Sequence, residues 1–253
     1  MLDEYVLVPD IFDPAAYSNA ALIDVCLSFL REPIYQEALV RDLSDGGWSR
    51  YCLANSGNLH RSCTEFMRKL ALGNRLRKCV QVGSSCPADA VGWCQEGVAT
   101  HASHPFSGTV AAHATKEAVF KGQNQVASIE RLAATPWWQA RSSSATFDRK
   151  TLSYLAALER TLAHANSLMF IDPYLDPSSP RYREFHRLLS PLAGRSPKPK
   201  IELHRSFNKG VDQAITPNLA YWQQAFAGLG QQLTQHGLQA EVFIWSDFHD
   251  RHL

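Results

Sequence analysis

The last stretch of the chain gathers the side chains best suited to chemistry. An apolar run over residues 241–245 is followed by Asp247, His249, Asp250, Arg251 and His252. Such a run is typical of a buried strand, so these polar groups would stand at a strand end. An imidazole, a carboxylate and a guanidinium in one place can hold an anion or transfer a proton. The stretch therefore predicts a site for one of these two tasks.

Two further apolar runs end in polar groups of the same kinds. The residues that follow the runs at 167–171 and 200–203 include Asp172, Tyr174, His204 and Arg205. If the three runs are neighbouring parallel strands, their carboxyl ends meet at one edge of a sheet. We therefore expect Asp172, Arg205 and His249 on a common rim, with Asp250 beside them and with Tyr174 and His204 as further ligand contacts.

Helical and strand patterns alternate through the second half of the chain. Helical spacing covers 149–165, 181–189 and 219–236, and the three apolar runs lie between these segments. Strands separated by helices of this length form right-handed crossovers and a parallel sheet covered on both faces. The sequence therefore predicts an α/β half with three layers.

The same polar residues also fit structural roles. Asp172 is suited to a turn with Pro173, and His204 to a satisfied histidine at a strand end. Asp250 and Arg251 could form a structural ion pair. A functional role and a purely structural role therefore both remain open for these residues.

The order of these elements, with the motifs FIDPYL, IELHR, VFIW and FHDRHL, resembles the phospholipase D-like domain. The resemblance covers about 146–253 and is to the divergent form found at the C-termini of microtubule-interacting-and-trafficking proteins and in relatives from bacterial conflict systems. Active members of the wider superfamily carry His-x-Lys, in which the histidine attacks phosphorus and the lysine holds the phosphoryl oxygens. Here His249 and Arg251 match that motif as His-x-Arg.

The resemblance implies binding more than cleavage. Active members use two such motifs and a downstream aspartate, whereas this chain shows one motif and ends at Leu253. We therefore expect a C-terminally truncated domain whose open sheet edge is covered by a second copy or by a partner protein. A homodimer would also supply the second motif.

The front half, residues 1–145, is predicted to be a mainly helical domain of unknown type. Helical spacing covers 19–30, 35–43, 61–72, 88–98 and much of 111–138, and short strand-like runs occur at 5–8 and 79–82. A serine-rich segment, 141–148, marks the boundary between the halves.

A group of histidines in the front half offers an alternative site. His101 and His104 follow Glu96 at a spacing that could ligate a metal ion. Because Pro105 comes next, the histidines fit a helix end or a loop equally well. A metal-assisted hydrolase therefore remains a lesser hypothesis.

Composition limits the classes of function. The chain has 25 basic and 24 acidic residues, which excludes the charge of a dedicated nucleic-acid coat or a polybasic membrane binder. Six cysteines without a CxxC pair are expected to be reduced thiols, and no apolar segment approaches the roughly 20 residues of a membrane span. We expect a soluble, cytoplasmic protein without a cofactor.

Two main hypotheses follow. The first is a phospholipase D-like module that recognises a phosphate-bearing ligand, such as nucleic acid, within a bacterial multi-protein assembly of the anti-phage defence type. The second is a phosphodiesterase or nuclease with His249 as nucleophile and Arg251 as phosphate clamp, in which Asp172 or Asp250 orients or relays protons.

Overall fold

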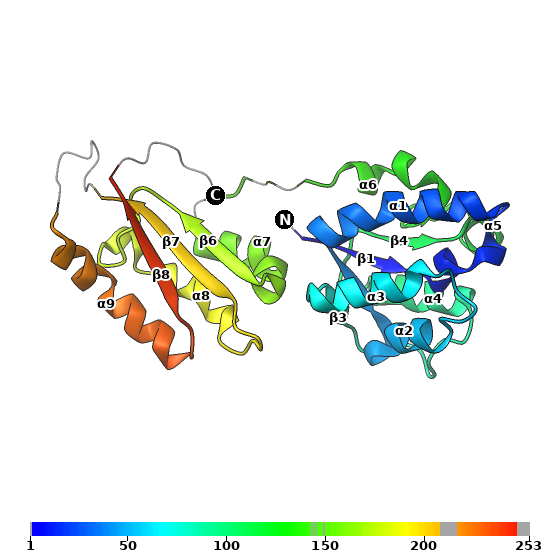
Figure 1. Cartoon of the computed structure of the whole chain (residues 1–253), viewed down its shortest axis with the longest axis horizontal. Helices are drawn as coiled ribbons and strands as arrows, with labels where there is room; N and C mark the ends of the chain where they lie inside the picture. Colours follow the sequence, from blue (N-terminus) through cyan, green and yellow to red (C-terminus); the bar gives the residue numbers. More distant parts are fainter. Residues whose placement is uncertain (1, 143, 145, 149, 208–216, 247–253) are drawn as a thin grey trace. The chain divides into compact units, whose positions relative to one another are not determined.

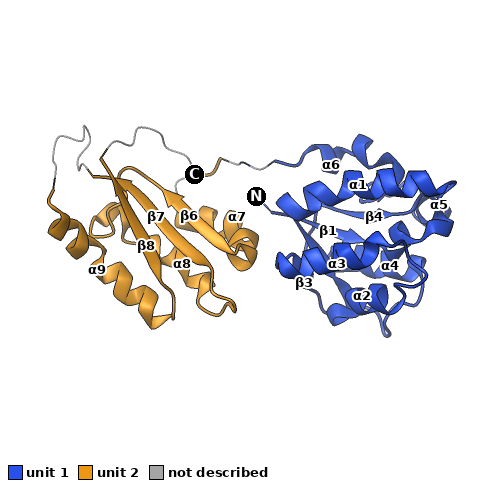
Figure 2. Cartoon of the chain, viewed as in Figure 1, with its two compact units in different colours: residues 1–145 blue, residues 146–253 orange. Residues whose placement is uncertain are grey.

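The chain forms two compact units, Met1–Ala145 and Thr146–Leu253 (Figure 2). The computed structural model describes residues 2–142, 144, 146–148, 150–207 and 217–246 (Figure 1). Both units combine helices with parallel strands, so the fold class is α/β, as the sequence predicts. All six cysteines are free thiols. Within the described ranges, no helix combines the length and the apolar character that crossing a bilayer requires.

Unit 1 is built on a five-stranded parallel sheet with the order β3-β2-β1-β4-β5. Its strands are β1 (Asp3–Leu7), β2 (Ala38–Asp42), β3 (Leu76–Lys78), β4 (Gly108–Ala111) and β5 (Val126–Ser128). Its helices are α1 (Ala20–Glu37), α2 (Leu43–Ala54), α3 (Ser62–Leu72), α4 (Ala90–Thr100), α5 (His113–Val119) and α6 (Pro136–Gln139). The strand order reverses direction between β1 and β4, which is the arrangement of a doubly wound sheet.

Helices cover both faces of this sheet. On one face, the ring of Tyr5 in β1 lies 5.2 Å from that of Trp138 in α6, which also contacts Phe29 of α1. On the other face, α4 approaches β1 so closely that a Cβ atom at Gly97 would stand 2.7 Å from Val6 Cγ1. Only glycine lets α4 pack at this distance.

Unit 1 has more helical than strand residues, but the prediction of a mainly helical domain omitted its five-stranded sheet. The predicted helix over 35–43 is wrong, because α1 gives way there to β2, in which Val40 pairs with Tyr5. The helical spacing over 111–138 likewise contains the strand β5 between helical turns. A short apolar run fits a buried strand as well as a helix, and that ambiguity concealed the sheet.

Unit 2 contains a three-stranded parallel sheet with the order β6-β7-β8. Its strands are β6 (Ser167–Ile171), β7 (Lys200–Ser206) and β8 (Ala240–Trp245), and its α-helices are α7 (Thr151–His164), α8 (Phe185–Leu189) and α9 (Leu219–Gln235). The strands lie where the alternating pattern predicts them. Their parallel pairing confirms the crossover connections expected from the sequence.

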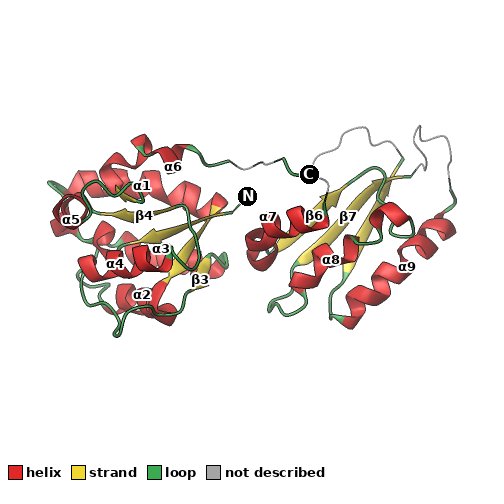
Figure 3. Ribbon diagram, turned by 180° about the vertical axis from the view of Figure 1, so that it is seen from behind, coloured by secondary structure: helices red, strands yellow, loops and turns green. Residues whose placement is uncertain are grey.

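The helices of unit 2 pack on one face of the sheet (Figure 3). Leu203 of β7 shares a buried core with Trp222 of α9 and Leu162 of α7. In the described part of unit 2 no helix covers the opposite face, where Met169 and Trp245 are 57% and 45% exposed. The expected third layer is therefore absent from the described residues, which form two layers in this half.

Candidate functional site

The carboxyl ends of the three strands in unit 2 lie side by side. The Asp172 N–H donates to the His204 carbonyl at 3.1 Å, and the Ser206 N–H donates to the Pro173 carbonyl at 3.3 Å. The turn that begins at Asp172 is thus attached to the end of β7. Because Ser206 also pairs with Trp245 in register, β8 ends at the same edge. This edge is the rim that the sequence predicts.

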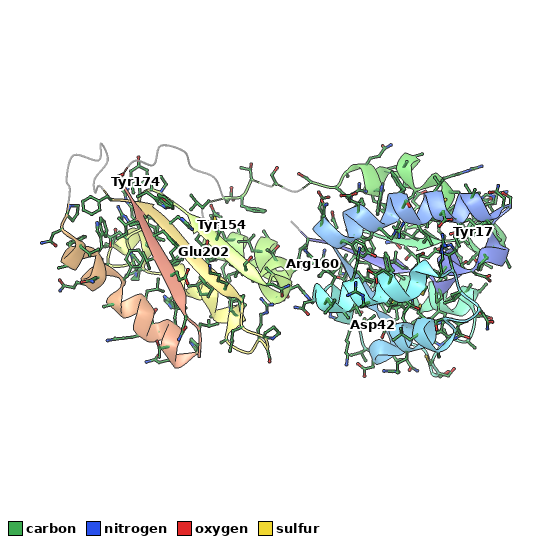
Figure 4. All side chains as sticks on the ribbon, viewed as in Figure 1. Tyr17, Asp42, Tyr154, Arg160, Tyr174 and Glu202 are labelled. Carbon is green, nitrogen blue, oxygen red and sulfur yellow. The ribbon has the colours of Figure 1, made fainter. Side chains whose placement is uncertain are left out.

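Asp172 forms the turn that its sequence context favours. Its Oδ1 accepts a hydrogen bond from the Tyr174 N–H at 2.9 Å, and its Oδ2 accepts one from the Tyr182 hydroxyl at 2.7 Å. The first bond is an Asx turn, in which the side chain mimics a backbone acceptor. Tyr174 lies at this end of the sheet and is half-buried (Figure 4). The structure therefore holds the Asp172 carboxylate in one orientation at the rim.

Asp176 is a rim residue that the sequence places after the same strand as Asp172 but that was not among the predicted site residues. Its Oδ1 accepts bonds from the N–H and the hydroxyl of Ser178, and its Oδ2 accepts one from the Tyr221 hydroxyl at 3.2 Å. The side chain is buried. A signal was present, because the sequence repeats Asp-Pro at 172–173 and 176–177, and each aspartate forms the same kind of turn. Two successive Asx turns shape this loop.

Arg205 is buried beneath these two turns and is 1% exposed. Its guanidinium carbon lies 3.5 Å from the centre of the Trp222 ring, and its Nη1 donates to the Leu175 carbonyl at 2.6 Å. Burial lowers the pKa of Arg205 to about 10, while the nearby charges of Asp176 and Asp172 act in the opposite direction. The side chain therefore stays protonated at neutral pH and holds the rim loops in place.

His204 does not join Arg205, although the sequence predicts that both contact the ligand. Successive side chains on a strand point to opposite faces, so His204 lies on the uncovered face. There its Nδ1 accepts a hydrogen bond from Trp245 Nε1 at 3.0 Å, and its Nε2 lies 3.3 Å from a carboxylate oxygen of Glu202. Its ring is parallel to that of Phe243, with the centroids 4.7 Å apart. The structure thus places His204 and Arg205, both predicted to contact the ligand, on opposite faces of the sheet.

The remaining predicted site residues, His249, Asp250 and Arg251, lie outside the described residues. Of the predicted catalytic and ligand-binding residues, Asp172, Arg205 and Tyr174 therefore lie at the described rim. The structure brings these three together.

The alternative metal site in the front half is not formed. The Glu96 carboxylate accepts two backbone N–H bonds from the loop between β3 and α4, at 2.7 and 2.9 Å. His101 lies at the end of α4, where its ring packs edge-on against Phe106, and the His104 ring forms a hydrogen bond with the Ser103 hydroxyl at 3.1 Å. Across the described residues, no group of three or more histidine, cysteine, aspartate or glutamate side chains is placed to hold a metal ion. The His101/His104 hypothesis is corrected accordingly.

A buried ion network crosses the sheet of unit 1. Glu4 is fully buried, and its carboxylate contacts Arg41 at 2.8 Å and Arg77 at 2.9 Å. Arg41 is itself 1% exposed and donates to the Thr100 hydroxyl at 2.9 Å. These charges lie inside the packed domain, so their role is structural.

The switch point of the unit 1 sheet carries one buried acid. Asp10 follows β1, and its Oδ1 accepts a bond from the Ala112 N–H, just after β4, at 3.1 Å. Burial raises the pKa of the Asp10 carboxyl, and bonds from Thr115 and Ala112 oppose that shift. The sequence marks only a strand end here, because the switch point depends on the order of the strands.

No protein-family model, curated protein or solved structure matches the chain. The resemblance of residues 146–253 to the phospholipase D-like domain therefore stays a prediction from the residues.

Proposed function

We propose that unit 2 is a phospholipase D-like module that recognises a phosphate-bearing ligand at the carboxyl ends of β7 and β8. The observation that supports this proposal is the parallel register of β6, β7 and β8, which brings three polar strand ends to one edge. Ligands of open parallel sheets bind at that edge. The resemblance further suggests a bacterial multi-protein assembly of the anti-phage defence type.

The charges of the described rim assign separate roles to its residues. Asp172 and Asp176 contribute two carboxylates, and Arg205 contributes one buried guanidinium that already serves the loops. An anion would be repelled by this set unless further positive charge is supplied. We therefore assign phosphate contact to Arg251 and His249, which follow β8 in the sequence, and a positioning role to Arg205.

A calorimetric titration with pyrophosphate tests this assignment. Arg251→Gln should weaken binding about tenfold or more, the usual effect of losing one charge-assisted contact. Arg187→Gln is the matched control, because Arg187 is an exposed arginine of unit 2 that forms an ion pair with Glu184. Equal binding by both variants would refute the phosphate role of Arg251.

A second candidate function is a phosphodiesterase or nuclease that uses His249 as its nucleophile. The observation that favours it is the Asp172 carboxylate, which Tyr182 and the Tyr174 N–H hold in one orientation at the rim. Plasmid, single-stranded DNA, RNA and bis-nitrophenyl phosphate should be tested with and without EDTA. Cleavage that resists EDTA and is lost in His249→Ala supports catalysis, whereas binding without turnover supports recognition alone.

We also propose that β8 pairs with a second copy or with a partner protein. In the described sheet β8 has a neighbour on one side only, so its other edge presents unpaired backbone groups. Light scattering across a dilution series should reveal a dimer if a second copy fills this role. A monomer at every concentration would leave the partner protein as the occupant.

A further inference from the structure

A groove lies between strand β8 and helix α9, away from the rim (Figure 1). Its volume is about 630 Å³, within the roughly 300 to 1,000 Å³ of pockets that hold ligands. Its apolar lining includes Leu203 of β7 and Phe226, Leu229 and Leu233 of α9. Val242 of β8 also lines the groove and is 39% exposed. The β8–α9 groove therefore presents apolar side chains to solvent.

One wall of the β8–α9 groove is a strand edge. In the described sheet β7 is the only neighbour of β8, so alternate backbone N–H and C=O groups of β8 point away from the sheet. An extended segment that pairs with β8 would satisfy these groups. Every second side chain of that segment would then point to the helix-covered face and enter the groove.

The other wall, helix α9, has no charged residue over its whole length. Its exposed residues include Ala227, Gly230 and Thr234. Helix α7 of the same unit, by comparison, exposes Glu159. The solvated face of a surface helix usually carries charges, whereas the buried centres of protein interfaces are depleted of them. The composition of α9 therefore favours a surface that a partner covers.

A second copy of the chain would not fill the β8–α9 groove. Pairing of two β8 strands about a two-fold axis would bring the partner's α9 toward it. The exposed α9 residues on the groove side are Gly230, which has no side chain, and Thr234, which has a short one. Such a pair would leave the apolar lining without the contacts of a packed interface. A segment with larger apolar side chains would supply them.

Positive charge lies at one end of the groove, beside the amino end of β8. Lys198 and Lys200 both line this end, and two glutamates pair with Lys200. The Lys198 ammonium donates to the carbonyls of Ala193 and His236, and it has no carboxylate partner among the described residues. An acidic residue of a bound segment would complement the charge of Lys198.

We infer that the β8–α9 groove binds an extended segment of a partner protein. The segment pairs with β8 as a further strand, carries apolar side chains at alternate positions, and places an acidic residue beside Lys198. The inference rests on the proposed pairing of β8 and names the kind of partner that pairs with it.

Fluorescence anisotropy of the intact chain with labelled hexapeptides tests the inference. The probes alternate threonine with valine, isoleucine, leucine or phenylalanine and carry one glutamate at either end, and at least one should bind. Gly230→Leu should weaken binding about tenfold or more, because the new side chain occupies the groove. Gly228→Leu is the matched control and should bind normally. An added Cβ meets no atom within 4 Å at either glycine, but Gly228 does not line the groove.

Changes to the probe test the backbone and the charge separately. N-methylation of alternate amides should abolish binding in one of the two possible sets and not in the other, because only one set donates to β8. Replacing the glutamate by glutamine should weaken binding severalfold with the wild-type protein and leave it unchanged with Lys198→Gln.

Other results overturn stated parts of the inference. If neither N-methylated set loses binding, pairing with β8 is refuted. If one set loses binding but Gly230→Leu binds normally, pairing stands and the groove does not hold the side chains. Equal effects of the glutamine probe on the wild-type protein and Lys198→Gln refute the acidic contact. If no probe binds at millimolar concentration, or if a dimer persists in saturating probe, the partner segment is refuted, and in the second case a second copy occupies β8.

Discussion

The two units use the same α/β principle but differ in how completely helices cover the sheet. In unit 1, helices pack on both faces of β1, and the polar groups beneath them, such as Glu4 and Arg41, bind one another. In unit 2, helices pack on one face, and among the described residues no helix covers the other, where Met169 and Trp245 are exposed. The comparison indicates that charged side chains have a structural role where helices cover both faces of the sheet. Where helices cover one face only, side chains on the other face stay accessible to a ligand.

The largest expected effect tests the scaffold role of charge in unit 1. Arg41→Gln would leave the fully buried Glu4 carboxylate without its closest partner, and breaking a buried ion pair costs about 3 to 5 kcal/mol. Urea unfolding followed by peptide-resolved hydrogen exchange should locate the loss in unit 1. Arg68→Gln, which breaks an exposed pair with Glu65, should change the free energy of unfolding far less, because solvent screens exposed ion pairs. Equal costs would contradict the comparison.

A somewhat smaller effect is expected from Arg205 in unit 2. Arg205→Gln removes the guanidinium that stacks on Trp222 and donates to the Leu175 carbonyl, and should destabilise unit 2 by about 2 to 3 kcal/mol. The same exchange measurement should show unit 1 unchanged. A stable variant that loses only pyrophosphate binding would show instead that Arg205 contacts the ligand directly.

Sequence patterns predicted unit 2 better than unit 1 for a physical reason. In unit 2, helices of ordinary length separate strands whose apolar runs are clear, such as Ser167–Ile171. In unit 1, β3 and β5 have three residues each, and β2 carries Arg41 and Asp42, so periodicity is weak. The sequence could not predict the number of layers in unit 2. Apolar residues on the uncovered face of its sheet, such as Met169, resemble core residues in the sequence.

The candidate site was predictable in part. Because the carboxyl ends of parallel strands meet at one edge, the sequence predicts that Asp172 and Arg205 share a rim. In the structure the two side chains are close enough to interact electrostatically. The separation of His204 from Arg205 follows from strand alternation alone and was open to prediction. The partnership of His204 with Trp245 required the register of β7 against β8, which no sequence pattern supplies.

A modest effect is expected for Asp10, which tests whether every buried charge in unit 1 is stabilising. Because burial raises the pKa of this carboxyl, the native state favours the protonated form. The stability that this preference adds is complete below the ordinary pKa of an aspartate. It is lost as the pH rises through the pKa of Asp10 in the native state. Asp10→Asn should therefore stabilise the protein by about 1 kcal/mol at neutral pH.

The gain from Asp10→Asn should shrink as the solution is acidified, because the wild-type carboxyl then becomes neutral as well. Thermal unfolding of both proteins across a pH series measures the difference directly. A gain that grows in acid would contradict the assignment.

The smallest expected effect concerns the hydrogen bond that holds Trp245. His204→Phe removes the ring nitrogen that accepts the bond from Trp245 Nε1. In this variant the Trp245 indole should therefore exchange its hydrogen severalfold faster than in the wild-type protein. The indole of Trp222, which donates to the Phe207 carbonyl, provides the internal control. Parallel acceleration of both indoles would indicate general loosening of unit 2 and not loss of the acceptor at position 204.

The incomplete covering of the unit 2 sheet has a practical consequence for identifying what binds there. A three-stranded sheet that has helices on only one face in the described part of the chain is expected to melt at a lower temperature than the sheet of unit 1, which helices cover on both faces. A compound that occupies the bare side raises only the lower of the two melting transitions, by an amount set by its concentration relative to its dissociation constant. Calorimetric screening of the intact chain would thus report occupancy of unit 2 and use unit 1 as a built-in reference.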